Sequence, residues 1–214
     1  MTITGRSLMD RMTVDLQPGE LDGLRLEPME ISEVEAQFDQ LRAMVNPGRP
    51  DRSVRAGMYM RLVDDRHFWM SDTPAERADH LEAVRHISDP SCRRVLVNGL
   101  GLGMVLGAAL SFDHVEHVDV VEIDPRVIRL VGSQYTTRDA RVNIILADAR
   151  RQRDQWQAGV RWDVGWTDIW PDLDTDNLSD MAAFRASYGR RCGWHDCWGR
   201  ELLASLRRQE RRIS

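Results

Sequence analysis

The chain has 214 residues, a formal net charge of −5, 42% hydrophobic residues and 29% charged residues, which predicts a globular fold of one domain with a small appendage. All 29 basic residues are arginine, so a P-loop lysine, a lysine Schiff base and a lysine general base are excluded. The acidic balance argues against a nucleic-acid partner. No apolar run reaches the ~18 residues of a membrane span, and no signal-peptide pattern opens the chain, so we expect a cytoplasmic protein without a membrane partner.

Residues 1–72 are predicted to form an N-terminal arm, a helix and a β-hairpin ahead of a main domain at 73–214. Weak periodicity over 1–30 predicts a loose arm or irregular edge structure. Apolar residues at helical spacing predict a helix over 31–45 with Ser32 as N-cap. Two apolar runs around a polar turn predict a hairpin at 57–72, and a helix follows over 74–87.

From Arg94 onward, strands and helices alternate. Buried-strand patterns are expected at 95–98, 118–123, 142–146 and 162–167, with helices at 104–110 and 125–135 between them. This succession predicts an α/β fold with a Rossmann-like parallel sheet and right-handed crossovers. The remainder of the domain is expected to be helical, over 178–191 and 199–212.

The segment "VLVNGLGLGMVLGAAL" places Gly99, Gly101 and Gly103 between a strand and a helix. Glycines at such a turn let a phosphate or sugar approach the backbone, and the helix N-terminus adds N–H groups. The spacing G-x-G-x-G differs from the dinucleotide fingerprint G-x-G-x-x-G, which disfavours a nicotinamide cofactor. A plain tight turn is the alternative interpretation.

Two carboxylates follow the next strands. Glu122 ends the second strand of the domain, where a carboxylate can accept both hydroxyls of a ribose; a solvated strand end is the alternative. Asp148 ends the third strand, where it can accept from an adenine amino group while the Ala149 N–H reaches a ring nitrogen; a helix N-cap is the alternative. All three features lie at carboxyl ends of parallel strands, where such sheets bind ligands.

The motifs "RRVLVNGLGLGMVLGAAL", "VDVVEIDP", "RVNIILADAR" and "WDVGWTDIWPD" resemble, in order and spacing, those of class I S-adenosylmethionine-dependent methyltransferases, in the spermidine-synthase-like branch. That branch carries an N-terminal hairpin with a "SDE…HE" element, and "FWMSDTPAERADHLEAV" stands in its place. The resemblance covers about residues 55–172. It implies S-adenosylmethionine as cofactor, with the glycine loop against its methionine part, Glu122 and the adjacent Ile123 at the ribose, and Asp148 with Ala149 at the adenine.

The loop after the fourth strand is where such enzymes place groups that face the substrate. Asp168 is our candidate for amine binding or general base, because it resembles the first acid of the aminopropyltransferase motif "DSSDP". The second acid is not matched, since Trp170-Pro171 intrudes and Asp172 comes one place late, which puts polyamine synthesis in doubt. Trp170, Asp172 and His80 are further candidates for substrate contacts; a solvated loop and packed core residues are the alternatives.

Three functions remain open on these residues. The first is methyl transfer to an unidentified acceptor, a small molecule or protein of cationic character. The second is a non-catalytic binding protein built on a degenerate methyltransferase fold, and the third is aminopropyl transfer.

The end of the chain differs from a complete methyltransferase sheet of seven strands. Only 47 residues follow Thr167, and "RRCGWHDCW" is a poor strand candidate, so we expect a truncated sheet of four or five strands. Its exposed edge favours a homo-oligomer. The cluster Cys192, His195 and Cys197 lacks a fourth ligand at a familiar spacing, so reduced thiols rather than a metal site are expected.

Overall fold

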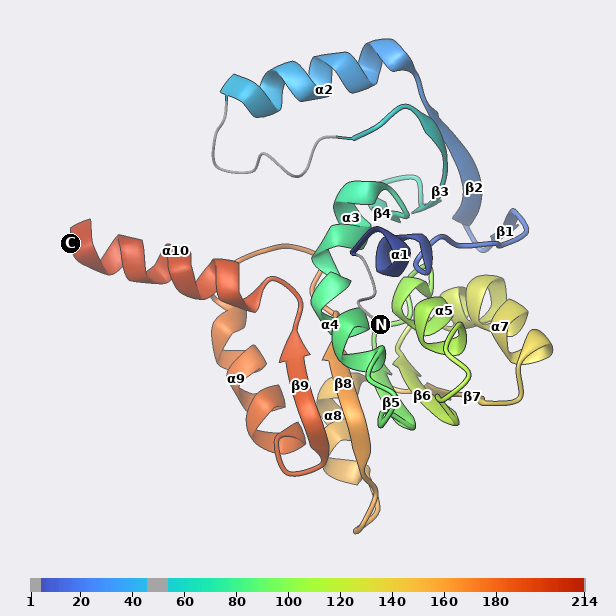
Figure 1. Ribbon diagram of the computed structural model, residues 1–214, viewed down its shortest axis with the longest axis vertical. Coiled ribbons are helices and arrows are strands. Elements are labelled where there is room, and N and C mark those ends of the chain that lie inside the picture. Colours follow the sequence, from blue (N-terminus) through green and yellow to red (C-terminus); the bar gives the residue numbers. More distant parts are fainter. Residues whose placement is uncertain (1–4, 46–53, 214) are drawn as a thin grey trace.

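The N-terminal part of the chain forms an antiparallel sheet (Figure 1). The computed structural model describes residues 5–45 and 54–213. The sheet order is β1-β2-β3-β4, with α1 before it and α2 inserted between its second and third strands. The elements are α1 (Gly5–Asp10), β1 (Gly19–Leu21), β2 (Leu24–Ile31), α2 (Glu33–Val45), β3 (Gly57–Val63) and β4 (Phe68–Ser71).

The loose arm or irregular edge structure predicted for 1–30 is wrong for the described residues 5–30, because they contain α1, β1 and most of β2, with β1 as a regular edge strand. Leu8 and Met12 are buried in the core that the main domain shares with this sheet, and Leu24 and Leu26 alternate inward from β2. These long-range contacts, which local periodicity does not reveal, order the segment.

The other N-terminal predictions are confirmed. The hairpin is β3–β4, and the helix at 31–45 is α2. Ser32 and Glu35 form a reciprocal capping box: the Glu35 N–H donates to Ser32 Oγ at 3.2 Å and the Ser32 N–H donates to Glu35 Oε2 at 2.8 Å.

The helix expected over 74–87 consists of two shorter helices, α3 (Pro74–Asp79) and α4 (Leu81–Ile87). His80 lies at the junction, with φ −100° and ψ −1°. Helix α4 packs against β8 of the parallel sheet, whereas α3 contacts α1 and is tied to the end of β4 by the hydrogen bond from the Ser71 N–H to Glu76. The junction also directs His80 toward the pocket described below.

The main domain is built on a five-stranded parallel sheet of order β7-β6-β5-β8-β9. The predicted α/β Rossmann-like fold is therefore confirmed. The strands are β5 (Arg94–Asn98), β6 (His117–Glu122), β7 (Val142–Leu146), β8 (Trp162–Thr167) and β9 (Cys192–Cys197).

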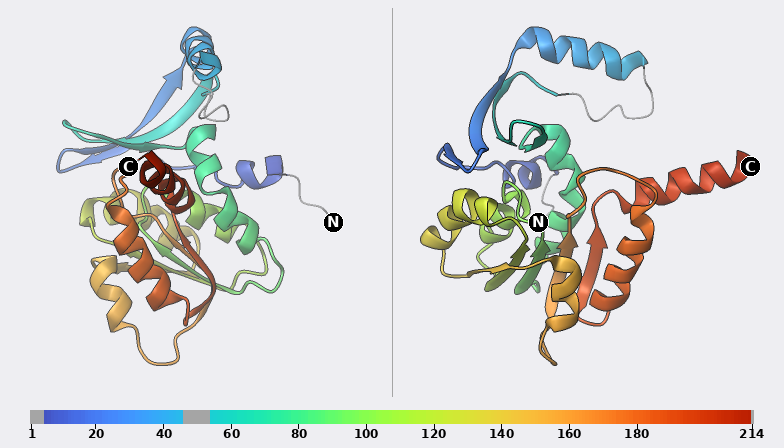
Figure 2. Two further views of the ribbon diagram at one scale, coloured as in Figure 1. Left: turned by 90° about the vertical axis from the view of Figure 1, so that its left-hand side faces the viewer. Right: turned by 180° about the vertical axis from the view of Figure 1, so that it is seen from behind.

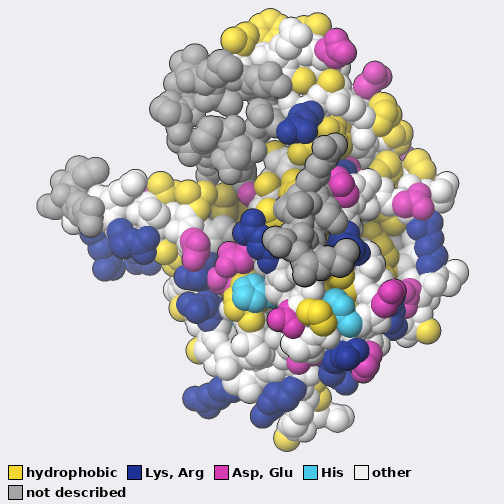
Figure 3. Space-filling model, viewed as in Figure 1, with side chains coloured by type: hydrophobic (Ala, Val, Ile, Leu, Met, Phe, Trp, Pro, Cys, Tyr) yellow, Lys and Arg dark blue, Asp and Glu magenta, His cyan; other side chains and the backbone are white. Residues whose placement is uncertain are grey.

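Helices cover both faces of this sheet (Figure 2). One face packs against α4, α5 (Met104–Leu110) and the helical stretch formed by α6 (Pro125–Val127), a π-helical turn at Ile128–Gly132 and α7 (Ser133–Arg138). The other face packs against α8 (Ala149–Gln155) and α9 (Asn177–Tyr188). The last helix, α10 (Arg200–Ile213), contacts α9 and then projects from the body, and arginine side chains gather along one side of it (Figure 3).

The fifth strand corrects the interpretation of "RRCGWHDCW". This segment forms β9, parallel to β8, although its sequence lacks an apolar alternation. Its polar side chains are paired inside the fold: the His195 ring lies 2.9 Å from Thr167 Oγ1, and Trp194 stacks on His86 with ring centroids 4.1 Å apart. All three cysteines are free thiols.

Within the described ranges, no group of three or more His, Cys, Asp or Glu side chains is arranged to hold a metal ion. No helix in the same ranges has both the length and the apolar character needed to cross a membrane.

Candidate active site

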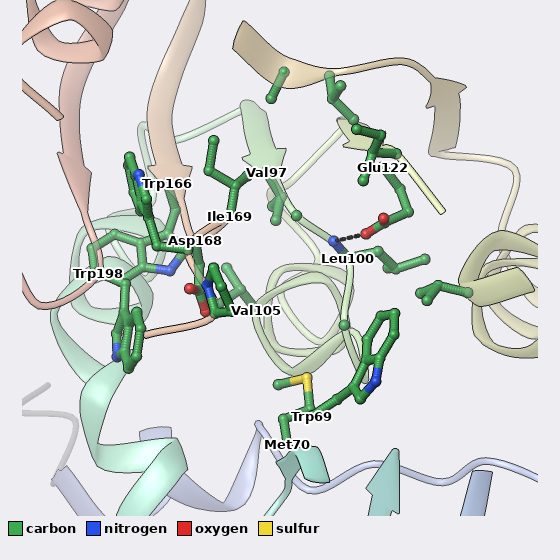
Figure 4. A pocket seen from close by; sticks show the side chains of 18 of the residues that line it. Trp69, Met70, Val97, Leu100, Val105, Glu122, Trp166, Asp168, Ile169 and Trp198 are labelled. Atoms are coloured by element: carbon green, nitrogen blue, oxygen red, sulfur yellow. Dashed lines mark hydrogen bonds between the residues drawn. The ribbon is translucent and has the colours of Figure 1, made fainter. Parts of the chain in front are cut away.

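A pocket of about 440 Å³ opens at the carboxyl ends of the central strands, where the N-terminal sheet meets the parallel sheet (Figure 4). Its size is that of a small-molecule site. Residues from both parts of the chain line it. Among them are Trp69, Met70, Glu76, Asp79, His80, Gly99, Gly101, Glu122, Ile123, Asp148, Ala149, Arg150, Trp166, Asp168, Trp170 and Trp198.

Glycine is required at two pocket-lining positions of the loop between β5 and α5. Gly99 has φ +92°, and a Cβ atom there would overlap the carbonyl oxygen of Asp168. Gly101 has φ +49°, and a Cβ atom there would overlap the sulfur of Met70. Gly103 has φ +73° but faces the ring of Tyr135 and is outside the pocket lining. Two of the three glycines thus face the pocket, and the third serves packing.

Glu122 holds the loop in place. Its Oε2 accepts from the Leu100 N–H at 2.8 Å, drawn in Figure 4, and its Oε1 accepts from the Asp124 N–H at 2.8 Å. Each carboxylate oxygen can accept more than one hydrogen bond. Glu122 therefore shapes the loop and keeps acceptor capacity toward the pocket, which suits the two hydroxyls of a ribose.

Asp148 is a helix N-cap, which was the alternative interpretation of this residue, and it also lines the pocket. Its Oδ1 caps α8 by accepting from the Arg150 N–H at 2.9 Å. Ile123, 63% exposed, and the buried Ala149 lie with it along the same wall. An acceptor beside an apolar surface fits the amino group and the flat face of an adenine.

Asp168 follows β8, and its backbone N–H donates to the Asn98 carbonyl at 2.8 Å. Burial raises the pKa of its carboxyl from 3.8 to about 7, and the nearby charges of Asp79 and Glu76 act in the same direction. A carboxyl with a pKa near neutrality can both accept and release a proton at physiological pH.

His80 lies beside Asp168, with 3.8 Å between His80 Nε2 and Asp168 Oδ2. The Trp166 indole N–H donates to His80 Nδ1 at 3.2 Å. Because an indole nitrogen only donates, Nδ1 must be unprotonated and Nε2 must carry the hydrogen that faces Asp168. Burial also lowers the His80 pKa from 6.5 to about 4. His80 is thus a neutral neighbour of Asp168, not a cation paired with it.

The other two candidate substrate residues differ in placement. Trp170 lines the pocket, but it is 4% exposed and its indole N–H donates to Asp180 at 3.2 Å. Asp172 is exposed and outside the pocket lining.

The structure adds pocket residues that the sequence did not single out. Glu76 and Asp79 enter from α3, and the Trp198 indole N–H donates to Asp79 Oδ2 at 3.2 Å. Trp69 and Met70 enter from β4 (Figure 4). Trp69, Met70, Glu76 and Asp79 all lie in the segment "FWMSDTPAERADHLEAV". The acidic and aromatic residues of that segment were therefore the signal that the sequence offered.

The comparisons with known proteins add sequence and structural likenesses. No family model matches the chain. Two curated proteins of Ralstonia nicotianae, polyamine aminopropyltransferases 1 and 2, are each 37% identical over 111 residues, which cover 47% of this chain. The chain spans only 20% and 19% of the length of polyamine aminopropyltransferases 2 and 1.

Solved structures of spermidine synthases are also similar. The enzyme from Thermotoga maritima matches with a TM-score of 0.49 and 17% identity, over 82% of this chain and 53% of that chain. A spermidine synthase in complex with a transition-state analogue matches with a TM-score of 0.42 and 20% identity, over 74% of this chain and 46% of that one. From its own sheet topology and the partial sequence similarity to the aminopropyltransferases, the chain has an S-adenosylmethionine-dependent methyltransferase-like fold.

Proposed function

We propose that the chain transfers an aminopropyl group from decarboxylated S-adenosylmethionine to an amine acceptor. One observation carries this proposal, the charge of the pocket. Five of the side chains that line it are carboxylates and one is a guanidinium; they are Glu76, Asp79, Glu122, Asp148, Asp168 and Arg150.

This charge favours the decarboxylated donor over S-adenosylmethionine itself. Both donors carry a sulfonium and an ammonium group, but S-adenosylmethionine also carries a carboxylate. A pocket rich in carboxylates attracts the more positive donor and repels a further anion. Arg150 offers little compensation, because its Nε donates to Asp180 at 2.8 Å.

The same charge suits an amine acceptor. Glu76 and Asp79 lie close enough to Asp168 for their charges to act on its carboxyl group, and the Trp198 indole N–H donates to Asp79. Carboxylates attract an ammonium group, and the face of an indole stabilises a cation by a cation–π interaction. The acceptor amine must lose a proton before it can attack, and a carboxylate of raised pKa suits that task.

In the proposed reaction the acceptor nitrogen forms a bond to the propyl carbon next to sulfur, and the carbon–sulfur bond breaks. Its electron pair stays on sulfur, which leaves as the neutral thioether 5′-methylthioadenosine. The proton of the amine passes to Asp168 and then to solvent. The residues around the glycine loop hold the donor, and Asp168 and His80 flank the acceptor.

The test is a product analysis by mass spectrometry. The purified chain is incubated with putrescine or spermidine and with either donor. The proposal expects 5′-methylthioadenosine and an aminopropylated amine in equal amounts from the decarboxylated donor, and loss of both products in Asp168→Asn. S-adenosylhomocysteine formed from S-adenosylmethionine would instead support methyl transfer. No product from either donor, in a chain that binds them, would support a non-catalytic binding protein.

A further inference from the structure

Met70 reaches from the N-terminal sheet into the glycine loop of the other sheet (Figure 4). The Leu102 N–H donates to Met70 Sδ at 3.2 Å. A Cβ atom on Gly101 would overlap the same sulfur and lie 3.1 Å from Met70 Cε. The thioether therefore fills the space that the absence of a side chain at Gly101 leaves beside the pocket.

With this contact, most of the backbone N–H groups of the glycine loop have hydrogen-bond partners within the protein. The Gly99 N–H donates to the Val121 carbonyl at 2.8 Å, the Leu100 N–H to Glu122 at 2.8 Å, and the Gly103 N–H to the Leu100 carbonyl at 2.7 Å. With the Leu102 N–H on Met70, four of the five N–H groups from 99 to 103 have partners in the protein. Backbone N–H groups at the start of a helix are otherwise well suited to bind a carboxylate.

The neighbours of Met70 fix its position. The Ser71 N–H donates to Glu76 Oε2 at 2.9 Å. Asp72, which is 2% exposed, accepts from the Met60 N–H at 2.7 Å and from Arg77 Nη2 at 2.8 Å. The end of β4 is thus tied to β3 and α3, so Met70 is held against the loop instead of moving away from it.

We propose that Met70 is a donor-specificity residue: its thioether takes the Leu102 N–H and the space beside Gly101, and so excludes a donor that carries the methionine carboxylate. This inference rests on the proposed use of an S-adenosyl sulfonium donor. It locates one cause of the preference for the decarboxylated form in a residue of the N-terminal sheet. The acidic lining adds a second, independent cause.

Isothermal titration calorimetry with S-adenosylmethionine and decarboxylated S-adenosylmethionine tests the proposal. The wild-type chain is expected to bind the decarboxylated donor more tightly. Met70→Ala opens the space and frees the Leu102 N–H. The affinity for S-adenosylmethionine relative to that for the decarboxylated donor should therefore rise about tenfold, which corresponds to one new hydrogen bond to a charged group. Met58→Ala, at a 64% exposed methionine of β3 outside the pocket lining, is the matched control and should leave the ratio unchanged.

A second variant, Met70→Leu, separates the effect of the opened space from a general effect of changing the residue. Met70→Leu also removes the sulfur that accepts from the Leu102 N–H, but it keeps most of the apolar volume, and such replacements are well tolerated. The leucine side chain should still cover this N–H, so the ratio should stay within about threefold of wild type. An unchanged ratio in Met70→Ala, with both donors bound, would overturn the assignment. Equal shifts in Met70→Leu and Met70→Ala would also overturn it, because occupied space would then not matter. If neither donor binds the wild-type chain, the proposed function itself fails, and this assignment with it.

Discussion

The raised pKa of Asp168 makes the stability of the fold depend on pH. Folding raises this pKa from 3.8 to about 7, so between these values the folded state binds more protons than the unfolded state. Stability from this group is complete when the pH is below its unfolded pKa, and it is lost as the pH rises through the folded pKa. The contribution of Asp168 to the stability of the wild-type chain should therefore decrease between pH 5 and pH 8.

The size of this loss of stability follows from the two pH units that separate pH 5 from the pKa of Asp168 in the folded state. At 1.36 kcal/mol per unit the loss is about 3 kcal/mol at most. The Asp168 side chain is 24% exposed to the pocket, and solvent screening reduces the loss to about 1.5 kcal/mol. Asp168→Asn has no charge to bury, so relative to wild type it should gain about 1.5 kcal/mol of stability from pH 5 to pH 8.

Urea denaturation followed by circular dichroism at the two pH values measures this change. Asp172→Asn is the matched control, because the Asp172 side chain is exposed and lies outside the pocket lining. The stability of this variant should change with pH in the same way as that of wild type. If Asp168→Asn lost stability with pH as steeply as wild type, burial of the Asp168 charge would not be the cause, and the argument for a neutral-pH base would fall.

Three further predictions concern turnover, the loop and the donor site. The rate of aminopropyl transfer should rise with pH through about 7 as Asp168 loses its proton, whereas a rate that falls over this range would contradict its role as base. Gly99→Ala should destabilise the fold by at least about 2 kcal/mol in urea denaturation, which is more than the control Gly23→Ala. Both glycines have a positive φ, but only a Cβ atom at position 99 would overlap backbone atoms. Equal losses of stability in the two variants would refute the close approach at Gly99. Glu122→Gln should weaken calorimetric binding of the decarboxylated donor about tenfold, while Glu116→Gln, at an exposed residue far from the pocket, should bind as wild type.

The parallel sheet and the pocket residues that follow its strands were predictable because both depend on local order along the chain. Each of the first four strands is a short apolar run, and the residues of interest follow directly at the strand ends. Glu122 and Asp148 could therefore be placed at one edge of the sheet before any contact was known. β9 was missed because its stability comes from pairing with β8 and from the contacts of Trp194 and His195, which no local pattern encodes.

The part of the pocket around Asp168 and Met70 was harder to predict from the sequence. His80 was named as a candidate, but its tautomer depends on Trp166, which is 86 residues away along the chain. The contact of Met70 with the glycine loop joins two sheets and spans 32 residues. Such long-range pairs arise from the docking of the two sheets, and only the three-dimensional arrangement shows which side chains meet.

A crystal structure of the chain soaked with 5′-methylthioadenosine tests the central claim most directly. The account predicts the ribose hydroxyls on Glu122, the adenine beside Asp148 and Ile123, and the thioether sulfur facing Asp168 across the pocket. A nucleoside bound elsewhere, or bound in this pocket with its sulfur directed away from Asp168, would contradict the account.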